Sequence, residues 1–165
     1  MKFNIVPIEE KHIEGFWYAV DSVSREHKYL TFLEGPPIHM SKDFVLNNLN
    51  NNWPHVVALE QGKVVGWCDI TARDRPVFSH IGSLGMGVLS SHRGHGVGSA
   101  LIQAVLERAQ QKSLTRIELT VRENNKPAIS LYKKIGFVEE GRHINAVCID
   151  GEYENHISMA LLCSK

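Results

Sequence analysis

The feature that most constrains the fold of this chain is the glycine-rich turn at residues 93–98 (RGHGVG). An apolar stretch at 79–89, predicted as a strand, precedes the turn, and a predicted helix at 96–111 follows it. One face of that helix is apolar and carries Leu101, Ile102, Val105, Leu106 and Ala109. A helix N-terminus presents unpaired backbone N–H groups and the positive end of the helix dipole. Since glycines leave that backbone accessible, the turn predicts an anion site, above all for phosphate.

The spacing of the glycines narrows the class of phosphate ligand. Three glycines within residues 94–98 cost conformational entropy on folding, which disfavours a turn with only a structural role. The Walker pattern GxxxxGK[ST] is excluded because no lysine follows these glycines. The dinucleotide pattern GxGxxG also fails, because its last position falls on Ser99 or Leu101. The pattern that remains is Arg-x-x-Gly-x-Gly, from Arg93 through Gly96 to Gly98.

The order of predicted elements indicates an α+β protein with a mixed sheet. Strands are predicted at 3–7, 56–60, 63–71, 79–89, 116–121, 137–149 and 153–162. Helices are predicted at 9–29, 96–111 and 127–135, and Gly136 ends the last of these. A further short helix is predicted to begin at Ser41, which is a good N-cap residue. No repeat, linker or low-complexity segment divides the chain, so residues 1–165 are expected to form a single domain.

Charge, cysteine and histidine content limit the partners and the compartment. Eighteen basic residues balance eighteen acidic ones, which removes the simplest argument for a nucleic-acid or membrane partner. No run approaches the ~18 apolar residues of a membrane span. The three cysteines lack CxxC spacing, which indicates reduced thiols in a cytoplasmic protein. His92 and His95 lie in the glycine-rich loop, a poor frame for zinc, so no metal site is expected.

A second motif lies downstream of the glycine turn. Residues 125–137 (NKPAISLYKKIGF) resemble the signature N-x-x-A-x-x-x-Y-x-x-x-G-F of the GNAT superfamily of N-acetyltransferases. The glycine turn resembles the acetyl-CoA motif of the same superfamily. The two motifs together are far more specific than either alone. The later part of the chain looks most like the bacterial amino-acid and RimI-like branch, and the resemblance is weakest at residues 24–52.

The resemblance implies a fold and a cofactor site. The fold would be a central mixed, mostly antiparallel sheet, flanked by about four helices and splayed between residues 86–88 and 120–121, with acetyl-CoA in the gap. Backbone groups near Val88 would orient the thioester arm, the turn would hold the pyrophosphate, and Asn125, or its neighbour Asn124, would bond the pantetheine. The residues expected at the cofactor are Met86, Gly87, Val88, Arg93, Gly94, His95, Gly96, Val97, Gly98, Ser99, Asn124, Asn125 and Tyr132.

The resemblance also suggests the catalytic groups. Tyr132 matches the usual general acid, which would protonate the thiolate that leaves when an amine attacks the thioester. The alternative role for Tyr132 is that of an aromatic residue in the core. Some relatives carry a glutamate base at the position of Gly82, which leaves His80, two residues earlier on the same strand face, as the candidate base. The alternatives to His80 are Asp69, Glu118 and a chain of water molecules, with His80 then an exposed histidine at the end of the strand.

The acceptor side is expected in the weakly matched region. Tyr29, Phe32, Glu34 and His39 could line an amine pocket, or belong to a surface loop anchored by aromatic side chains. The expected activity is acetyl transfer from acetyl-CoA to the primary amine of a small molecule or amino acid. The alternatives are acetylation of a protein N-terminus or lysine, and a CoA-binding regulatory domain without catalysis. A homodimer is expected because relatives are often dimers.

Overall fold

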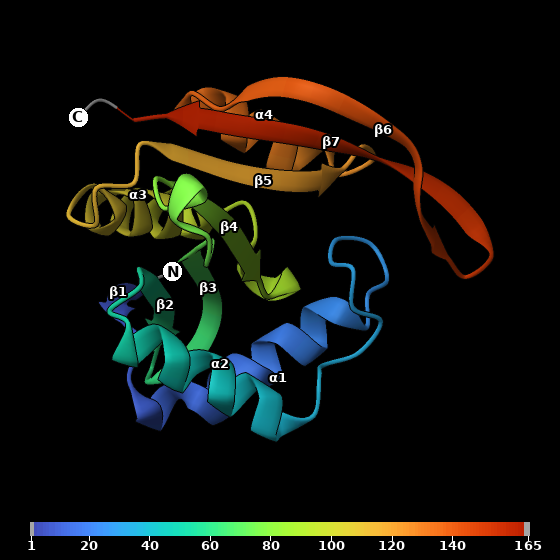
Figure 1. Ribbon diagram of the computed structural model, residues 1–165. Helices are drawn as coiled ribbons and strands as arrows, with labels where there is room; N and C mark the ends of the chain where they lie inside the picture. Colours follow the sequence, from blue (N-terminus) through green and yellow to red (C-terminus); the bar gives the residue numbers. More distant parts are fainter. Residues whose placement is uncertain (1, 164–165) are drawn as a thin grey trace.

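Seven strands form one open, mixed sheet in a computed structural model of the protein, which describes residues 2–163 (Figure 1). The strands are β1 (Asn4–Pro7), β2 (His55–Glu60), β3 (Lys63–Ala72), β4 (Ile81–Val88), β5 (Arg116–Arg122), β6 (Val138–Ile149) and β7 (Glu152–Leu162). The α-helices within the same residues are α1 (Ile13–Ser24), α2 (Ile38–Asn50), α3 (Val97–Gln110) and α4 (Lys126–Ile135). The predicted α+β class is confirmed.

The sheet is continuous but splits along part of one strand pair. The strand order is β1-β2-β3-β4-β5-β7-β6, and neighbours are antiparallel except β4 and β5, which are parallel. Those two strands pair only from Ile81 and Arg116 to Ser83 and Glu118, although β4 continues to Val88. The strands therefore separate beyond Ser83, which confirms the predicted splay of the sheet.

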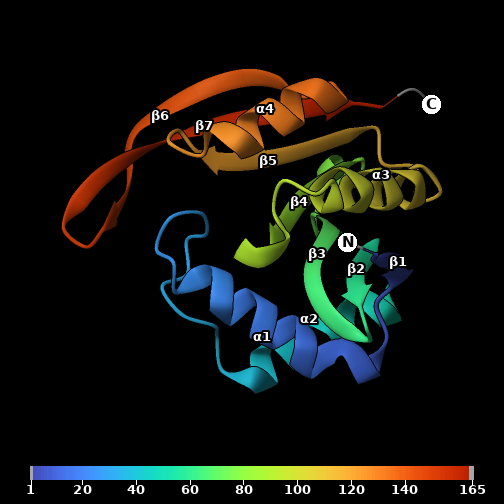
Figure 2. The same ribbon diagram turned by 180° about the vertical axis from the view of Figure 1, so that it is seen from behind.

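The two faces of β3 pack against different helices. Because successive side chains of a strand point to opposite faces, Trp67 joins one core with α1 and α2. Cys68 and Ile70 join a second core with α3 and α4. In both views α1 and α2 lie side by side, across β3 from α3 (Figure 1, Figure 2). Strand β3 therefore separates the two cores.

Two predicted helix boundaries are wrong. Helix α1 ends at Ser24 rather than near residue 29, and His27 adopts φ 55°, a left-handed conformation that does not continue a helix. Helix α2 begins at Ile38, with Pro37 rather than Ser41 in the N-cap position. Ser41 is buried inside this helix, so its hydroxyl is not free to act as a cap.

The segment between α1 and α2, residues 25–37, is called here the α1–α2 loop. It runs close to the tip of the β6–β7 hairpin, which extends past the rest of the sheet (Figure 1). Hydrogen bonds tie the loop to α1, β5 and the hairpin: Gly35 N donates to Asp21 Oδ1 (2.8 Å), Trp17 Nε1 donates to the Pro36 carbonyl (2.7 Å), Arg122 Nη1 donates to the His27 carbonyl (2.9 Å), and His27 Nδ1 lies 2.8 Å from Asp150 Oδ2. The loop therefore has a defined course, and it borders both cavities described below.

Candidate active site

The glycine turn forms the start of α3, as predicted. Gly94 and Gly96 adopt φ of 75° and 82°, and nothing lies within 4 Å of where a Cβ atom would project from either. Gly96 is the N-cap of α3, and no side chain among residues 2–163 caps this helix end. The backbone N–H groups of the first turn therefore keep their capacity to bind an anion, next to the positive end of the helix dipole.

A cleft of about 670 Å³ lies in front of this turn, between the end of β4 and helix α4. Most of the residues expected at the cofactor line it: Met86, Gly87, Val88, Arg93, Gly94, Gly96, Gly98, Ser99, Asn125 and Tyr132. The structure does not bring three others to its wall. His95 and Asn124 are exposed, and the Val97 side chain is buried in the core beside α3. Val97 can therefore contribute only its backbone.

Arg93 lines the cleft, but its guanidinium is engaged by other groups of the protein. Its two terminal nitrogens donate to the carboxylate of Glu26 at 2.8 and 2.5 Å, and its Nε donates to the Val88 carbonyl at 2.9 Å. The guanidinium also lies 4.4 Å from the centre of the Tyr29 ring. These contacts tie the glycine turn to the α1–α2 loop, so Arg93 acts here as a structural link.

Two residues of the second motif face the cleft from α4. The side-chain oxygen of Asn125 accepts a hydrogen bond from Ala128 N (3.3 Å) and so caps the helix; a contact with a ligand would come from its amide nitrogen. Tyr132 is only 7% exposed and packs with its ring centre 5.7 Å from that of Phe137. Burial, with a smaller effect of Cys68, raises the pKa of its phenol. Tyr132 is therefore protonated at neutral pH and can serve as a proton donor.

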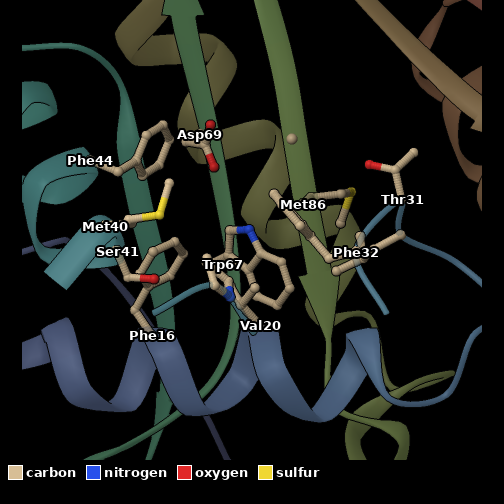
Figure 3. A pocket seen from close by; sticks show the side chains of 13 residues that line it. Phe16, Val20, Thr31, Phe32, Met40, Ser41, Phe44, Trp67, Asp69 and Met86 are labelled. Atoms are coloured by element: carbon tan, nitrogen blue, oxygen red, sulfur yellow. The ribbon is translucent and has the colours of Figure 1, made fainter. Parts of the chain in front are cut away.

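A second, apolar cavity of about 370 Å³ adjoins the cleft at Met86, which lines both (Figure 3). Helices α1 and α2, strands β3 and β4, and the α1–α2 loop form its walls. The lining residues are Phe16 and Val20 from α1; Met40, Ser41 and Phe44 from α2; Trp67 and Asp69 from β3; Gly85 and Met86 from β4; and Leu30, Thr31, Phe32 and Pro36 from the loop. Asp69 is the one charged residue among these lining side chains within residues 2–163.

Asp69 lies on β3 directly opposite Gly85 of β4. A Cβ atom at Gly85 would stand 3.5 Å from both carboxylate oxygens, so the absent side chain leaves the carboxylate open to a small group. Asp69 is 7% exposed, and burial raises the pKa of its carboxyl to about 7. A group with this pKa accepts and releases protons readily near neutral pH.

The structure does not bring His80 to either cavity. His80 is exposed and precedes β4, and it lies five residues from Gly85, roughly 16 Å along an extended chain. A side chain at Gly82, on the same strand face, would clash with Ile70 at 2.4 Å, because this face packs against the core beside α3. Glu118 forms ion pairs with Arg73 and Arg116, both at 2.7 Å. Of the candidate bases, only Asp69 lines a cavity.

The residues expected at the acceptor site do not all lie in one cavity. Phe32 lines the apolar cavity and Tyr29 lines the cleft, whereas Glu34 and His39 are exposed and line neither. Among the residues that line the apolar cavity from α1, α2 and β3, only Asp69 is expected at the site from the sequence, as an alternative base. The apolar ones carry no such signal, because apolar residues at helical spacing look the same whether they fill a core or line a cavity. A detectable signal was Asp69 itself, a charged residue inside the apolar strand sequence VVGWCDITA.

Residues 2–163 contain no group of three or more His, Cys, Asp or Glu side chains that could hold a metal ion. Over the same range, no helix has the length and apolar character needed to cross a membrane.

Comparison with known proteins adds independent evidence. The model of the acetyltransferase (GNAT) family matches residues 9–137. The L-amino acid N-acetyltransferase AaaT of Escherichia coli (strain K12) is 40% identical over 106 residues, which cover 64% of this chain and 65% of that protein. The matched part thus spans just under two thirds of that relative's length.

Two solved structures resemble the whole chain. The acetyltransferase of GNAT family from Streptococcus pneumoniae has a TM-score of 0.90 and 27% identity, with 99% of this chain and 100% of that chain covered. A GNAT superfamily phosphinothricin acetyltransferase from Sinorhizobium meliloti, in complex with AcCoA, has a TM-score of 0.93 and 17% identity, with 99% and 90% covered. At 17% identity, the similarity to the Sinorhizobium meliloti structure supports the fold alone.

Proposed function

The chain belongs to the acetyltransferase (GNAT) family, and from this premise we propose that it transfers an acetyl group from acetyl-CoA to the primary amine of a small molecule or amino acid. The observation that carries the proposal is the meeting of two cavities at Met86. One cavity contains a buried phenol that can donate a proton, and the other contains a buried carboxylate that can accept one. Attack of an amine on a thioester needs both proton transfers.

The cleft has the features that acetyl-CoA requires. The first turn of α3 offers backbone N–H groups for the pyrophosphate, and the positive φ of Gly94 and Gly96 holds the turn in a shape that side chains would strain. Beyond Ser83, β4 is no longer paired with β5. Apart from the Val88 carbonyl, which accepts from Arg93, the backbone groups that residues 86–88 turn toward this gap can pair with the amides of the pantetheine arm, as an added strand does at a sheet edge.

The proposed reaction uses Asp69 and Tyr132 on opposite sides of the reacting centre. An amine arrives as ammonium, with an ordinary pKa of ~10.4 for a lysine-like group, and Asp69 accepts one proton from it. The neutral nitrogen then attacks the thioester carbon; the N–C bond forms and the C–S bond breaks. Tyr132 donates its hydroxyl proton to the departing sulfur. The proton that the nitrogen loses as the amide forms restores Tyr132 through solvent.

The compartment and the oligomeric state are part of the same proposal. Cys68, Cys148 and Cys163 are free thiols, which supports a reducing compartment such as the cytoplasm.

Strand β6 lies at the edge of the sheet and is exposed along most of its length. An exposed edge strand of this length favours pairing with another chain, and we propose a second copy of this protein; light scattering of the purified protein measures its mass.

The direct test measures release of CoA from acetyl-CoA by the purified protein, with a panel of primary amines and product detection by mass spectrometry. We expect amine-dependent release with stoichiometric N-acetylated product. Binding of acetyl-CoA without transfer to any amine would support a CoA-binding regulatory domain instead. Transfer to peptides but to no small amine would support protein acetylation. Either result would refute the proposed small-molecule activity.

A further inference from the structure

The apolar cavity carries information about the acceptor that the proposed activity leaves open. At its inner end, the Phe16 ring lies 6.2 Å from Phe44 in a stacked arrangement and 5.8 Å from Trp67 edge to face. Figure 3 shows Phe16 and Phe44 on one side of the cavity and Phe32 on the other, with Trp67 between them and Asp69 above Trp67. Such a lining attracts apolar groups and offers a single charge at one place.

The mouth of the cavity is apolar as well. Phe32 and Met40 line the cavity, yet they are 52% and 54% exposed. Large apolar side chains gathered at one opening are unusual on a surface unless they meet an apolar partner. A polar acceptor would gain nothing from this rim, whereas an apolar one would cover it.

The position of the charge fixes the orientation of the acceptor. The missing side chain at Gly85 opens the Asp69 carboxylate toward Met86, where the cavity joins the cleft that contains Tyr132. An ammonium at Asp69 therefore stands beside the thioester end of the cleft. The rest of the acceptor must then extend toward the aromatic end, because hydrogen bonds from Trp17 and to Asp21 hold the α1–α2 loop in place as the outer wall.

On the basis of the proposed function, we infer that the acceptor is a monoamine with an uncharged apolar body, about as large as the side chain of leucine or phenylalanine. A second ammonium, as in a polyamine, would have no counter-charge among the lining residues within 2–163, and burial of an unpaired charge is costly. A carboxylate in the body of the acceptor would face the same cost and would be repelled by Asp69. Asparagine-like amides would lose their hydrogen bonds to water.

The test compares acceptors of matched shape. Isoamylamine, 3-aminopropanamide and β-alanine each carry one primary amine on a two-carbon arm, and the arm ends in an isopropyl group, an amide and a carboxylate of similar size and branching. We expect kcat/KM for isoamylamine to exceed that for 3-aminopropanamide and for β-alanine by at least about tenfold, and spermidine to react more slowly than isoamylamine. Faster transfer to β-alanine, 3-aminopropanamide or spermidine than to isoamylamine would overturn the inference but not the proposed function. Absence of transfer to every amine would overturn both.

A pair of variants tests whether this cavity is the source of the preference. Met40→Lys places a cation at the mouth on α2, and Leu49→Lys places one on the same helix at a residue that is 38% exposed and outside the cavity lining. We expect Met40→Lys to lower the isoamylamine-to-β-alanine ratio of kcat/KM at least about fivefold, within the range that one contact contributes to specificity. Leu49→Lys should leave the ratio unchanged. Equal ratios in all three proteins would overturn the assignment of the cavity.

Discussion

Asp69 is the side chain whose environment is least compatible with a purely structural role. A carboxyl with its pKa raised to about 7 by burial acts as a base only when it is ionised, so kcat/KM of the native protein should rise with pH up to about 7. In Asp69→Asn this rise with pH should disappear, and kcat/KM should fall by about 10²–10⁴-fold. The increase of kcat/KM with pH that comes from deprotonation of the amine substrate remains in both the native protein and Asp69→Asn. The pH profile of initial rates measures this, with Asp74→Asn, on an exposed turn, as the control.

The same substitution should affect stability in the opposite direction to activity. The pKa of Asp69 is higher in the folded protein than the ordinary 3.8, so the folded state binds this proton more tightly than the unfolded state. The contribution of the group to the free energy of unfolding therefore falls as pH rises from about 4 to about 7. Asp69→Asn should thus gain more stability over the native protein at pH 8 than at pH 5, measured by urea unfolding. A loss of both activity and stability would indicate a structural residue.

Tyr132 can be tested without disturbing its packing. Tyr132→Phe keeps the ring that packs on Phe137 and removes only the hydroxyl, so we expect kcat to fall by about 10²-fold or more while the melting temperature stays close to that of the native protein. Tyr18→Phe, an exposed residue on α1, is the matched control. If Tyr132→Phe turns over as fast as the native protein, the leaving sulfur obtains its proton elsewhere.

The sequence identifies a chemically suitable side chain more readily than its position in space. Tyr132 and Asp69 could both be named from the sequence, one by a motif and the other by its charge within an apolar strand. His80 was preferred as the base because it shares a strand face with Gly82. The structure shows that this face packs against Ile70, and only the pairing of β3 with β4 reveals that Asp69 stands at the cavity. The ion pair of Arg93 with Glu26 joins residues 67 positions apart, which no local pattern could indicate.

The unit formed by β4, the glycine turn and α3 can be tested through its backbone. Gly96 has φ 82° and Gly62, in the β2–β3 hairpin, has φ 78°, with open space at both Cβ positions. An alanine in this conformation costs about 1–2 kcal/mol, so Gly96→Ala and Gly62→Ala should lower the stability by similar amounts. Only Gly96→Ala should raise KM for acetyl-CoA, because only this turn contacts the proposed pyrophosphate site. An equal KM in both variants would show that the turn does not bind the cofactor.

Elements with strong internal patterns were predictable, and those set by distant contacts were not. The α3 and α4 helices agree with prediction to within one residue, because apolar spacing and Gly136 mark them clearly. The predicted start of α2 is wrong, since Ser41 has the chemistry of an N-cap but lies inside a helix that begins at Ile38. The cavity walls from α1 and α2 follow from how these helices pack on β3, which depends on the whole fold.

The protein as a whole consists of two sheet segments, β1–β4 and β5–β7, which share only a short stretch of backbone pairing. Side chains add to this connection: Arg122 of β5 donates to the His27 carbonyl of the α1–α2 loop at 2.9 Å, and His27 contacts Asp150 at the tip of the β6–β7 hairpin. The order of elements was predictable from the sequence. The placement of β7 between β5 and β6 was not, because strand order depends on contacts between distant segments.

A ligand that fills the gap between these segments should stabilise the entire molecule. Acetyl-CoA would contact β4 and the glycine turn on one side and α4 on the other, so unfolding of either segment would release it. At 100 times its Kd, binding adds about 2.7 kcal/mol to the free energy of unfolding, which for a chain of 165 residues corresponds to a rise in melting temperature of roughly 5–10 °C. Differential scanning fluorimetry measures the shift, with ATP and NAD as matched controls that carry the same pyrophosphate chemistry without a pantetheine arm. If ATP or NAD raised the melting temperature as much as acetyl-CoA, the cleft would be a general nucleotide site, and the assignment of residues 86–88 to the pantetheine arm would fail.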